Sequence, residues 1–288
     1  MRIVHTDVFA LEEGGGNPCP VVLNSDGQTN EQMQQLAKEF GVECVFVVAS
    51  SHEDCEWKFR YFVPNNEMSM CVHATIGAVT VLVKEGQVTQ SPLFIETALG
   101  VVEVHWEKEN DDVFVTVKQW EPVYQERIPS VKELSEALQI NESDVADLPL
   151  ELISTSRSKL LVPMKDEETL HGIEPAFEKL WALCDQYETT GVYPFAVVKH
   201  KVNTFQARQF PNNSGYKEDS ATGVAASALG VYAFKHGLLT EKTNVCHVIQ
   251  GVAMNKPSIM MARTVIEQNH IVRSEVIGSA MIRNKNNR

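Results

Sequence analysis

The chain has 288 residues, of which 43% are hydrophobic and 22% charged, and this suits one large or two medium domains with a substantial core. Its formal net charge of -13 argues against nucleic acid or an anionic membrane surface as the main partner. The first residues lack the apolar core of a signal peptide, and no run of about 18 apolar residues is present to span a membrane. The six cysteines show neither CxxC pairs nor disulfide spacing, so we predict a cytoplasmic protein with reduced thiols.

The first half of the chain reads as strands with two helices among them. Thr29 or Asn30 caps a helix with apolar residues at helical spacing, and Gly41 ends it. Glu43 follows, directly before a buried-looking strand. The triple glycine at 14–16 is interpreted as a bend, because no Gly-Lys-Ser/Thr follows it. Strands are predicted at 3–9, 21–23, 44–49, 57–62, 93–98, 101–106 and 113–119, with a helix of small residues at 74–84.

The second half begins with a crossover at 120–129. Ser130 then caps a helix, and Glu133 stands at the capping-box position. Two further helices are predicted at 175–187 and 221–235, the second again rich in small residues. Strands are predicted at 195–199, 204–210, 245–250, 258–264 and from 271 onward. We expect the last strand to return to the first half.

One pattern occurs twice in the chain. Residues 60–66 and 208–213 each run from Arg-x-Phe to Pro-Asn-Asn, and each leads to an Ala-Thr pair that opens a small-residue helix. Subtracting 74 from 221, the positions of the two alanines, gives an offset of 147, about half the chain. Solenoid units run to roughly 50 residues, so this repeat predicts a duplicated half-domain instead.

The two helix starts suggest a site for an anion. A helix start exposes N–H groups and a partial positive charge, so the backbone alone can bind a carboxylate there. If the halves pack symmetrically, both starts face one cleft, and they would stabilise enolate charge when a neighbouring carbon loses a proton. Glu43, His73 and Asp219 are the candidate acids and bases.

Each candidate also has a structural interpretation. Asp219 or Ser220 fits an ordinary N-cap, His73 fits a hydrogen-bonded histidine at a helix start, and Glu43 fits a solvated strand edge. Cys71 fits a buried inert thiol as well as a thiolate nucleophile. The histidines are scattered without the spacing of zinc ligands, so we predict no metal site.

Motifs within residues 16–22, 37–47, 60–67, 71–75, 218–223 and 250–258 follow the order of a known family over nearly the whole chain. In these motifs the sequence resembles the phenazine-biosynthesis PhzF family, which shares the diaminopimelate-epimerase fold. The resemblance implies an α+β fold of two pseudo-symmetric halves, each a sheet rolled around a central helix, with the active site between them. We predict the halves at 1–122, to which 273–288 returns, and at 123–272. The resemblance also implies a cofactor-independent isomerase that moves a proton within a small carboxylate-bearing metabolite. It further implies a homodimer.

Site residues follow from the same resemblance. Glu43 matches the acid–base glutamate, and His73 and Asp219 match its catalytic partners. The residues expected at the substrate are Asn17, Cys71, Ala74, Thr75, Ala221, Thr222 and Gly223. The chain departs from the usual family motifs at Val42, Cys44, Val72 and Val224, and in residues 254–257. Thr222 stands where related epimerases have their second cysteine, and its hydroxyl does not ionise near neutral pH. This excludes epimerisation by two thiols.

Two alternatives stay open at the level of sequence. Beside the isomerase, one is a catalytically inactive binding or scaffold protein that kept the fold, and the other is an enzyme that uses the Cys71 thiol. Exchange of solvent protons into bound ligands would distinguish an isomerase from the first alternative. Loss of turnover on alkylation would favour the second.

Overall fold

The computed structural model describes residues 1–212, 214–240 and 243–283. It divides into two compact units, one of Met1–Lys118 with the end of the chain from Ile277, the other of Gln119–Val276. These divisions lie close to the predicted ones at 122 and 272. Asn213 of the predicted Pro-Asn-Asn turn, and residues 284–288 of the predicted returning tail, lie outside the described part. Within that part, no helix is long and apolar enough to cross a membrane.

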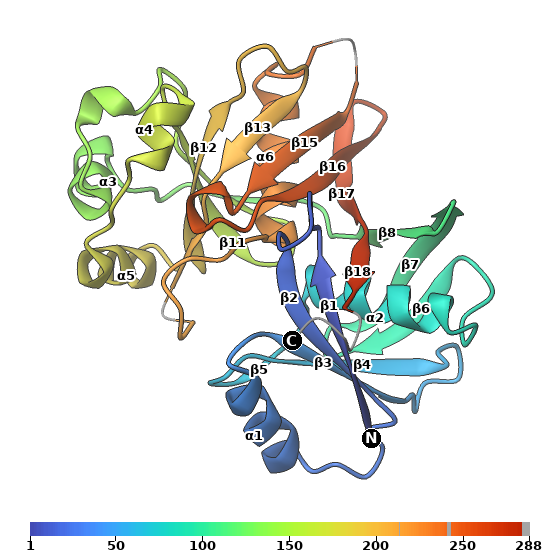
Figure 1. Ribbon diagram of the computed structural model, residues 1–288. Coiled ribbons are helices and arrows are strands. Elements are labelled where there is room, and N and C mark those ends of the chain that lie inside the picture. The colour runs from blue at the N-terminus through green and yellow to red at the C-terminus, as the bar shows by residue number, and fades with distance from the viewer. Residues whose placement is uncertain (213, 241–242, 284–288) are drawn as a thin grey trace. The chain divides into compact units, whose positions relative to one another are not determined.

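The first unit is a sheet rolled around one helix (Figure 1). Its elements are β1 (Arg2–Val8), β2 (Asn17–Leu23), α1 (Asn30–Phe40), β3 (Cys44–Ala49), β4 (Trp57–Phe62), β5 (Glu67–Met68), α2 (Val72–Lys84), β6 (Leu93–Thr97), β7 (Gly100–Glu109), β8 (Asp112–Lys118) and β18 (Ala280–Ile282). β1 pairs antiparallel with β2 and β18, β2 runs parallel to β3, β3 antiparallel to β4, and β4 parallel to β6. β6, β7 and β8 form an antiparallel meander. α2 packs against β1, β2, β3, β8 and β18.

The second unit repeats this plan around α6. Its elements are β9 (Val123–Gln125), α3 (Val131–Leu138), η1 (Glu142–Asp144), β10 (Glu151–Ser154), β11 (Ser158–Pro163), α4 (Glu167–His171), α5 (Phe177–Gln186), β12 (Gly191–Val197), β13 (Thr204–Ala207), β14 (Phe210–Pro211), α6 (Gly223–Lys235), β15 (Val245–Gln250), η2 (Val252–Met254), β16 (Ser258–Glu267) and β17 (His270–Gly278), which crosses the unit boundary. β10 pairs antiparallel with β11, β11 parallel with β12, β12 antiparallel with β13, β13 parallel with β15, and β15 antiparallel with β16. The strand directions from β1 through β7 recur from β10 through β16.

Both central helices are buried along nearly their whole length because their small residues allow strands to approach closely. A Cβ at Gly77 of α2 would lie 2.9 Å from Thr6 Oγ1, and one at Gly230 of α6 would lie 2.9 Å from Ala262 Cβ. Glycine at these two positions therefore sets the distance between helix and sheet. This confirms the predicted fold class of two α+β halves, each with a central helix.

The starts of the central helices differ from the prediction. α2 begins at Val72, so Ala74 is already its third residue, whereas α6 begins only at Gly223, after Ala221. Cys71 and Thr222 are the N-caps, and subtracting 71 from 222 gives 151, as does subtracting the helix ends, 84 from 235. The predicted equivalence of the two Ala-Thr pairs, with its offset of 147, is thus wrong by about one helical turn.

Helices cover the outer face of each sheet. α1 begins at the Thr29 cap, closes a capping box with Gln32, and ends at Gly41 in the left-handed conformation, as predicted. The predicted capping box of Ser130 and Glu133 also forms at α3. β9, β10, β11 and α4 were not predicted. Lys159, buried within β11, interrupts the apolar pattern there and masks the strand.

Candidate active site

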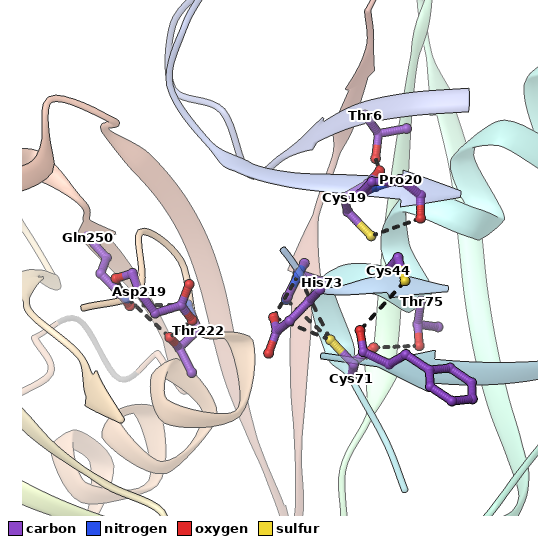
Figure 2. A network of polar contacts seen from close by, with 12 residues as sticks. Thr6, Cys19, Pro20, Cys44, Cys71, His73, Thr75, Asp219, Thr222 and Gln250 are labelled. Carbon is purple, nitrogen blue, oxygen red and sulfur yellow. Dashed lines mark hydrogen bonds and ion pairs between the residues drawn. The ribbon is translucent and has the colours of Figure 1, made fainter. Parts of the chain in front are cut away.

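Three chemically different side chains meet at the start of α2. Glu43 stands directly before β3, Cys71 is the N-cap of α2, and His73 lies in its first turn. His73 Nε2 is 3.0 Å from Glu43 Oε2, and His73 Nδ1 is 3.3 Å from Cys71 Sγ. The side chains of His73 and Glu43 are only 4% and 11% exposed, so their contact is shielded from water. Figure 2 shows the side chains of Cys71 and His73 directed toward each other.

The imidazole of His73 can connect the thiol to the carboxylate. An ionised carboxylate only accepts hydrogen bonds, so the proton of a neutral His73 belongs on Nε2, facing Glu43. Nδ1 is then an acceptor for the Cys71 thiol. This order gives a continuous path for a proton from sulfur through the ring to the carboxylate.

A hydroxyl pair fixes the backbone beneath this cluster. The Thr75 hydroxyl donates to the Cys71 carbonyl oxygen at 2.8 Å, and the Thr75 N–H donates to the same oxygen at 3.0 Å. Since the single hydroxyl proton of Thr75 is used, the Tyr61 hydroxyl is the donor in its 2.7 Å contact with Thr75 Oγ1. Burial raises the pKa of Tyr61, which keeps it protonated as that donor.

Two further thiols beside Glu43 are held in their neutral form. Burial, and then the charge of Glu43, raises the pKa of Cys44 to about 12. Burial first, then the neighbouring Cys44 and Glu43, raises the pKa of Cys19 well above its ordinary value. The Cys44 thiol donates to the Phe62 carbonyl oxygen. These two cysteines are therefore packing residues, in contrast to Cys71, which contacts an acid and a base.

In the second unit, Gln250 organises the segment that leads into α6. Its Nε2 donates to the Asp219 carbonyl oxygen at 2.7 Å and to Thr222 Oγ1 at 3.2 Å. Its Oε1 accepts from the Thr222 N–H at 3.2 Å and from the buried Tyr193 hydroxyl at 2.9 Å. The Thr222 hydroxyl donates to the Asp219 carboxylate, and Figure 2 shows Asp219, Thr222 and Gln250 as a hydrogen-bonded group of their own.

The N-cap interpretation of Asp219 and Ser220 is wrong. Thr222 is the N-cap of α6, and its side chain makes no capping hydrogen bond because it faces Asp219 instead. Asp219 is held from the other side by its N–H, which donates to the Gln209 carbonyl oxygen at 3.1 Å. Asp219 is thus an acid fixed ahead of a helix start, a position that suits contact with a ligand.

The remaining predicted site residues lie at the start of β2 and at the two helix starts. Asn17 begins β2 in register with Val8 of β1. Of the departures from the family motifs, Val72 is the first residue of α2, Val224 is the second of α6, and both are buried. The other predicted residues belong to the two helix starts, namely Ala74, Thr75, Ala221 and Gly223.

Sequence reasoning missed two supporting residues, Tyr61 and Gln250. Tyr61 was assigned only to an alternating strand, and Gln250 only to a motif matched by the family. Both act through contacts with residues far away in the chain, and their local patterns carry no signal of this.

Comparisons with known proteins agree with this architecture. A family model described as phenazine biosynthesis-like protein, PhzC-PhzF, matches residues 6–285. An uncharacterized isomerase of Clostridium acetobutylicum is 29% identical over 288 residues, covering 98% of this chain and 95% of the relative. A trans-2,3-dihydro-3-hydroxyanthranilate isomerase of Pseudomonas aeruginosa is 27% identical over 278 residues, 96% of this chain and 95% of that protein.

The fold comparison gives the same result. The crystal structure of a phenazine biosynthesis protein of the PhzF family from Bacillus anthracis matches with a TM-score of 0.87 at 26% identity, covering 99% of this chain and 98% of that one. The chain therefore belongs to the phenazine biosynthesis-like PhzC-PhzF family and shares the fold and the enzyme class of its named isomerases.

Proposed function

We propose that this protein is a cofactor-independent isomerase that moves a proton within a small carboxylate-bearing metabolite. The observation that carries the proposal is the contact of Glu43 with His73 at the start of α2, because it places a shielded acid–base pair beside backbone N–H groups. The family membership supports the same reaction class.

The proposed roles follow from the contacts of each group. Glu43 takes a proton from a substrate carbon, the electron pair moves into the adjoining π system, and the proton is returned at another carbon. No electrons are gained or lost, so the reaction needs no redox partner. His73 holds Glu43 through its 3.0 Å contact, and the start of α2 stabilises the substrate carboxylate. Asp219, fixed by Gln250 and Thr222, is proposed as an acid that orients substrate.

The named relative suggests the first compound to test. The Pseudomonas aeruginosa protein is called a trans-2,3-dihydro-3-hydroxyanthranilate isomerase, and that compound combines a carboxylate with a carbon framework in which a proton can shift. We propose substrates of this type, unsaturated hydroxylated amino acids.

The test is incorporation of deuterium from solvent into the substrate or product. We expect Glu43→Gln to reduce the exchange rate by about 10²–10⁴-fold, the usual contribution of general acid–base catalysis, while ligand binding is retained. Glu96→Gln is the matched control, since the Glu96 side chain is 16% exposed and also lies in the first unit. It should exchange at nearly the parent rate.

Two results would replace this proposal. If Glu43→Gln exchanges at the parent rate and Cys71→Ala does not, the enzyme uses the thiol. If the parent binds small carboxylates but exchanges no proton and forms no product, the chain is a binding protein that kept the fold.

A further inference from the structure

The cluster of Glu43, Cys71 and His73 has a second chemical property, which proton transfer does not use. One ligand atom from each residue, a carboxylate oxygen, a sulfur and a ring nitrogen, lies within 4.8 Å of the other two. Within the described part of the chain this is the one group of three or more such residues that could surround a metal ion. The spacing of the histidines in the sequence predicted no metal site, whereas these ligands come from two separate elements.

The distances approach those of a tetrahedral metal site. Zinc binds sulfur at about 2.3 Å and nitrogen or oxygen at about 2.0–2.2 Å, so neighbouring ligand atoms lie roughly 3.3–3.6 Å apart. Here Glu43 Oε2 is 3.0 Å from His73 Nε2, and Cys71 Sγ is 4.0 Å from each of these atoms. Side-chain shifts of about half an ångström bring all three within bonding distance of one ion.

The ligand set selects the kind of ion. A thiolate and an imidazole favour a borderline-soft cation such as Zn²⁺ or Co²⁺ over Mg²⁺ or Ca²⁺, which prefer oxygen ligands alone. Two anionic ligands, the carboxylate and the thiolate, balance a charge of +2. These two negative charges are larger than the partial positive charge of about half a unit at the start of α2, so the ligand set attracts a cation.

We propose that Glu43, Cys71 and His73 form a three-ligand site for a thiophilic divalent cation, with the fourth position left to water or a ligand oxygen. On binding, the Cys71 thiol loses its proton to solvent and the sulfur bonds to the metal. The ring proton of His73 moves to Nδ1 while Nε2 bonds to the metal. One proton is released for each ion bound.

Metal binding would also control the reaction. Glu43 bonded to the ion cannot accept a substrate proton, so the same cation inhibits proton transfer. This consequence rests on the proposed function, whereas the binding itself does not.

The decisive experiment is a titration of the metal-free protein with Co²⁺ alone, followed by its absorbance. We expect one ion per chain, a near-ultraviolet band from thiolate-to-cobalt charge transfer, visible bands typical of tetrahedral Co²⁺, and displacement of the cobalt by Zn²⁺. Release of one proton per ion should accompany binding in weakly buffered solution.

Variants assign the ligands. Cys71→Ala should abolish the charge-transfer band. Glu43→Gln and His73→Gln should keep a thiolate band but weaken affinity at least about tenfold, since loss of even an outer partner typically costs about 10–100-fold. Cys55→Ala is the matched control, a buried thiol of the same unit near His52 in sequence, and it should bind like the parent. Thermal unfolding of each variant verifies that it is folded.

Several outcomes would contradict the proposed metal site. They are Co²⁺ bound without a thiolate band, a band that persists in Cys71→Ala, or no binding by the folded parent. Failure of the proposed function is separate, because it appears as absent deuterium exchange while the cobalt spectrum is unchanged. Parent enzyme with one bound Zn²⁺ that still exchanges at full rate would contradict the inhibitory role alone.

Discussion

At the scale of single residues, the start of α2 is held by a backbone carbonyl group that accepts two hydrogen bonds. The Cys71 carbonyl oxygen accepts from both the N–H and the hydroxyl of Thr75, and Thr75 in turn accepts from Tyr61. The N-cap residue, and with it the thiol facing His73, is fixed by this chain of bonds. The position of Cys71 is therefore set in part by buried hydroxyls beneath it.

Replacement of Thr75 tests this support. Thr75→Val keeps the shape but leaves the buried Tyr61 hydroxyl without its acceptor, so we expect a loss of about 1–3 kcal/mol in unfolding free energy. Thr75→Ser keeps the hydroxyl and loses one methyl group, worth about 0.8 kcal/mol. Urea denaturation of the two variants provides the measurement. A valine variant as stable as the parent would show that the hydroxyl pair does not support the site.

Glu96 provides a prediction of pH dependence. Its hydrogen bond from Lys58, and then that from Ser50, lowers its pKa from an ordinary 4.5 to about 2. A pKa lowered by folding means that the stabilisation is fully present above pH 4.5 and is lost as the pH falls through 2. Glu96→Gln should therefore lower the melting temperature near pH 7, and the difference from the parent should vanish near pH 2. A difference that stays constant over this range would contradict the assignment.

At the scale of elements, the two units contain the same type of ion pair at equivalent places. Arg60 pairs with Glu67 through two hydrogen bonds of 2.8 and 2.7 Å, and Arg208 pairs with Glu218 through two of 2.9 and 2.8 Å. Each pair closes the loop between a strand and the following central helix. The repeated Arg-x-Phe motif of the sequence thus corresponds to a repeated ion pair that holds the helix start in place.

The next prediction concerns the effect of a small residue in a central helix on stability. Alanine normally stabilises a helix relative to glycine by about 0.8–1.0 kcal/mol. At Gly230 the added Cβ would lie 2.9 Å from Ala262 Cβ, so overpacking should reverse the sign and cost about 1–3 kcal/mol. The double variant Gly230→Ala with Ala262→Gly restores the space and should recover most of the loss in thermal unfolding. If the single variant is more stable than the parent, close packing does not set this position.

At the scale of the whole molecule, the duplicated plan gives each unit its own helix start and its own polar group. The first unit has Glu43 with His73, and the second has Asp219 with Thr222. Each unit therefore offers its own candidate group to the proposed reaction.

Hydrogen exchange can test whether a ligand binds at each helix start. One small carboxylate, added at saturating concentration, should slow amide exchange in peptides containing residues 72–75 and in those containing 219–224. The strand peptide 101–106 is the internal control and should not change. Protection of only one helix start would show that the carboxylate does not bind at the other.

Local patterns in the sequence determined much of this protein. The α1 caps at Thr29 and Gly41 and the alternating strand at 57–62 depend on hydrogen bonds and side-chain directions within a few residues. The family motifs identified Glu43, His73 and Asp219 as candidates and predicted the fold class. Such features are readable because neighbours in the chain are the interacting groups.

Tertiary structure alone decided how the candidates are combined. Cys71 and Glu43 are 28 positions apart, and the pairing of strands, not their spacing, brings them within 4.0 Å. The same holds for Gln250, which reaches Asp219 across 31 positions, and for the helix register, which differs by one turn from the repeat in the sequence. Because these contacts depend on packing between distant segments, no local pattern encodes them.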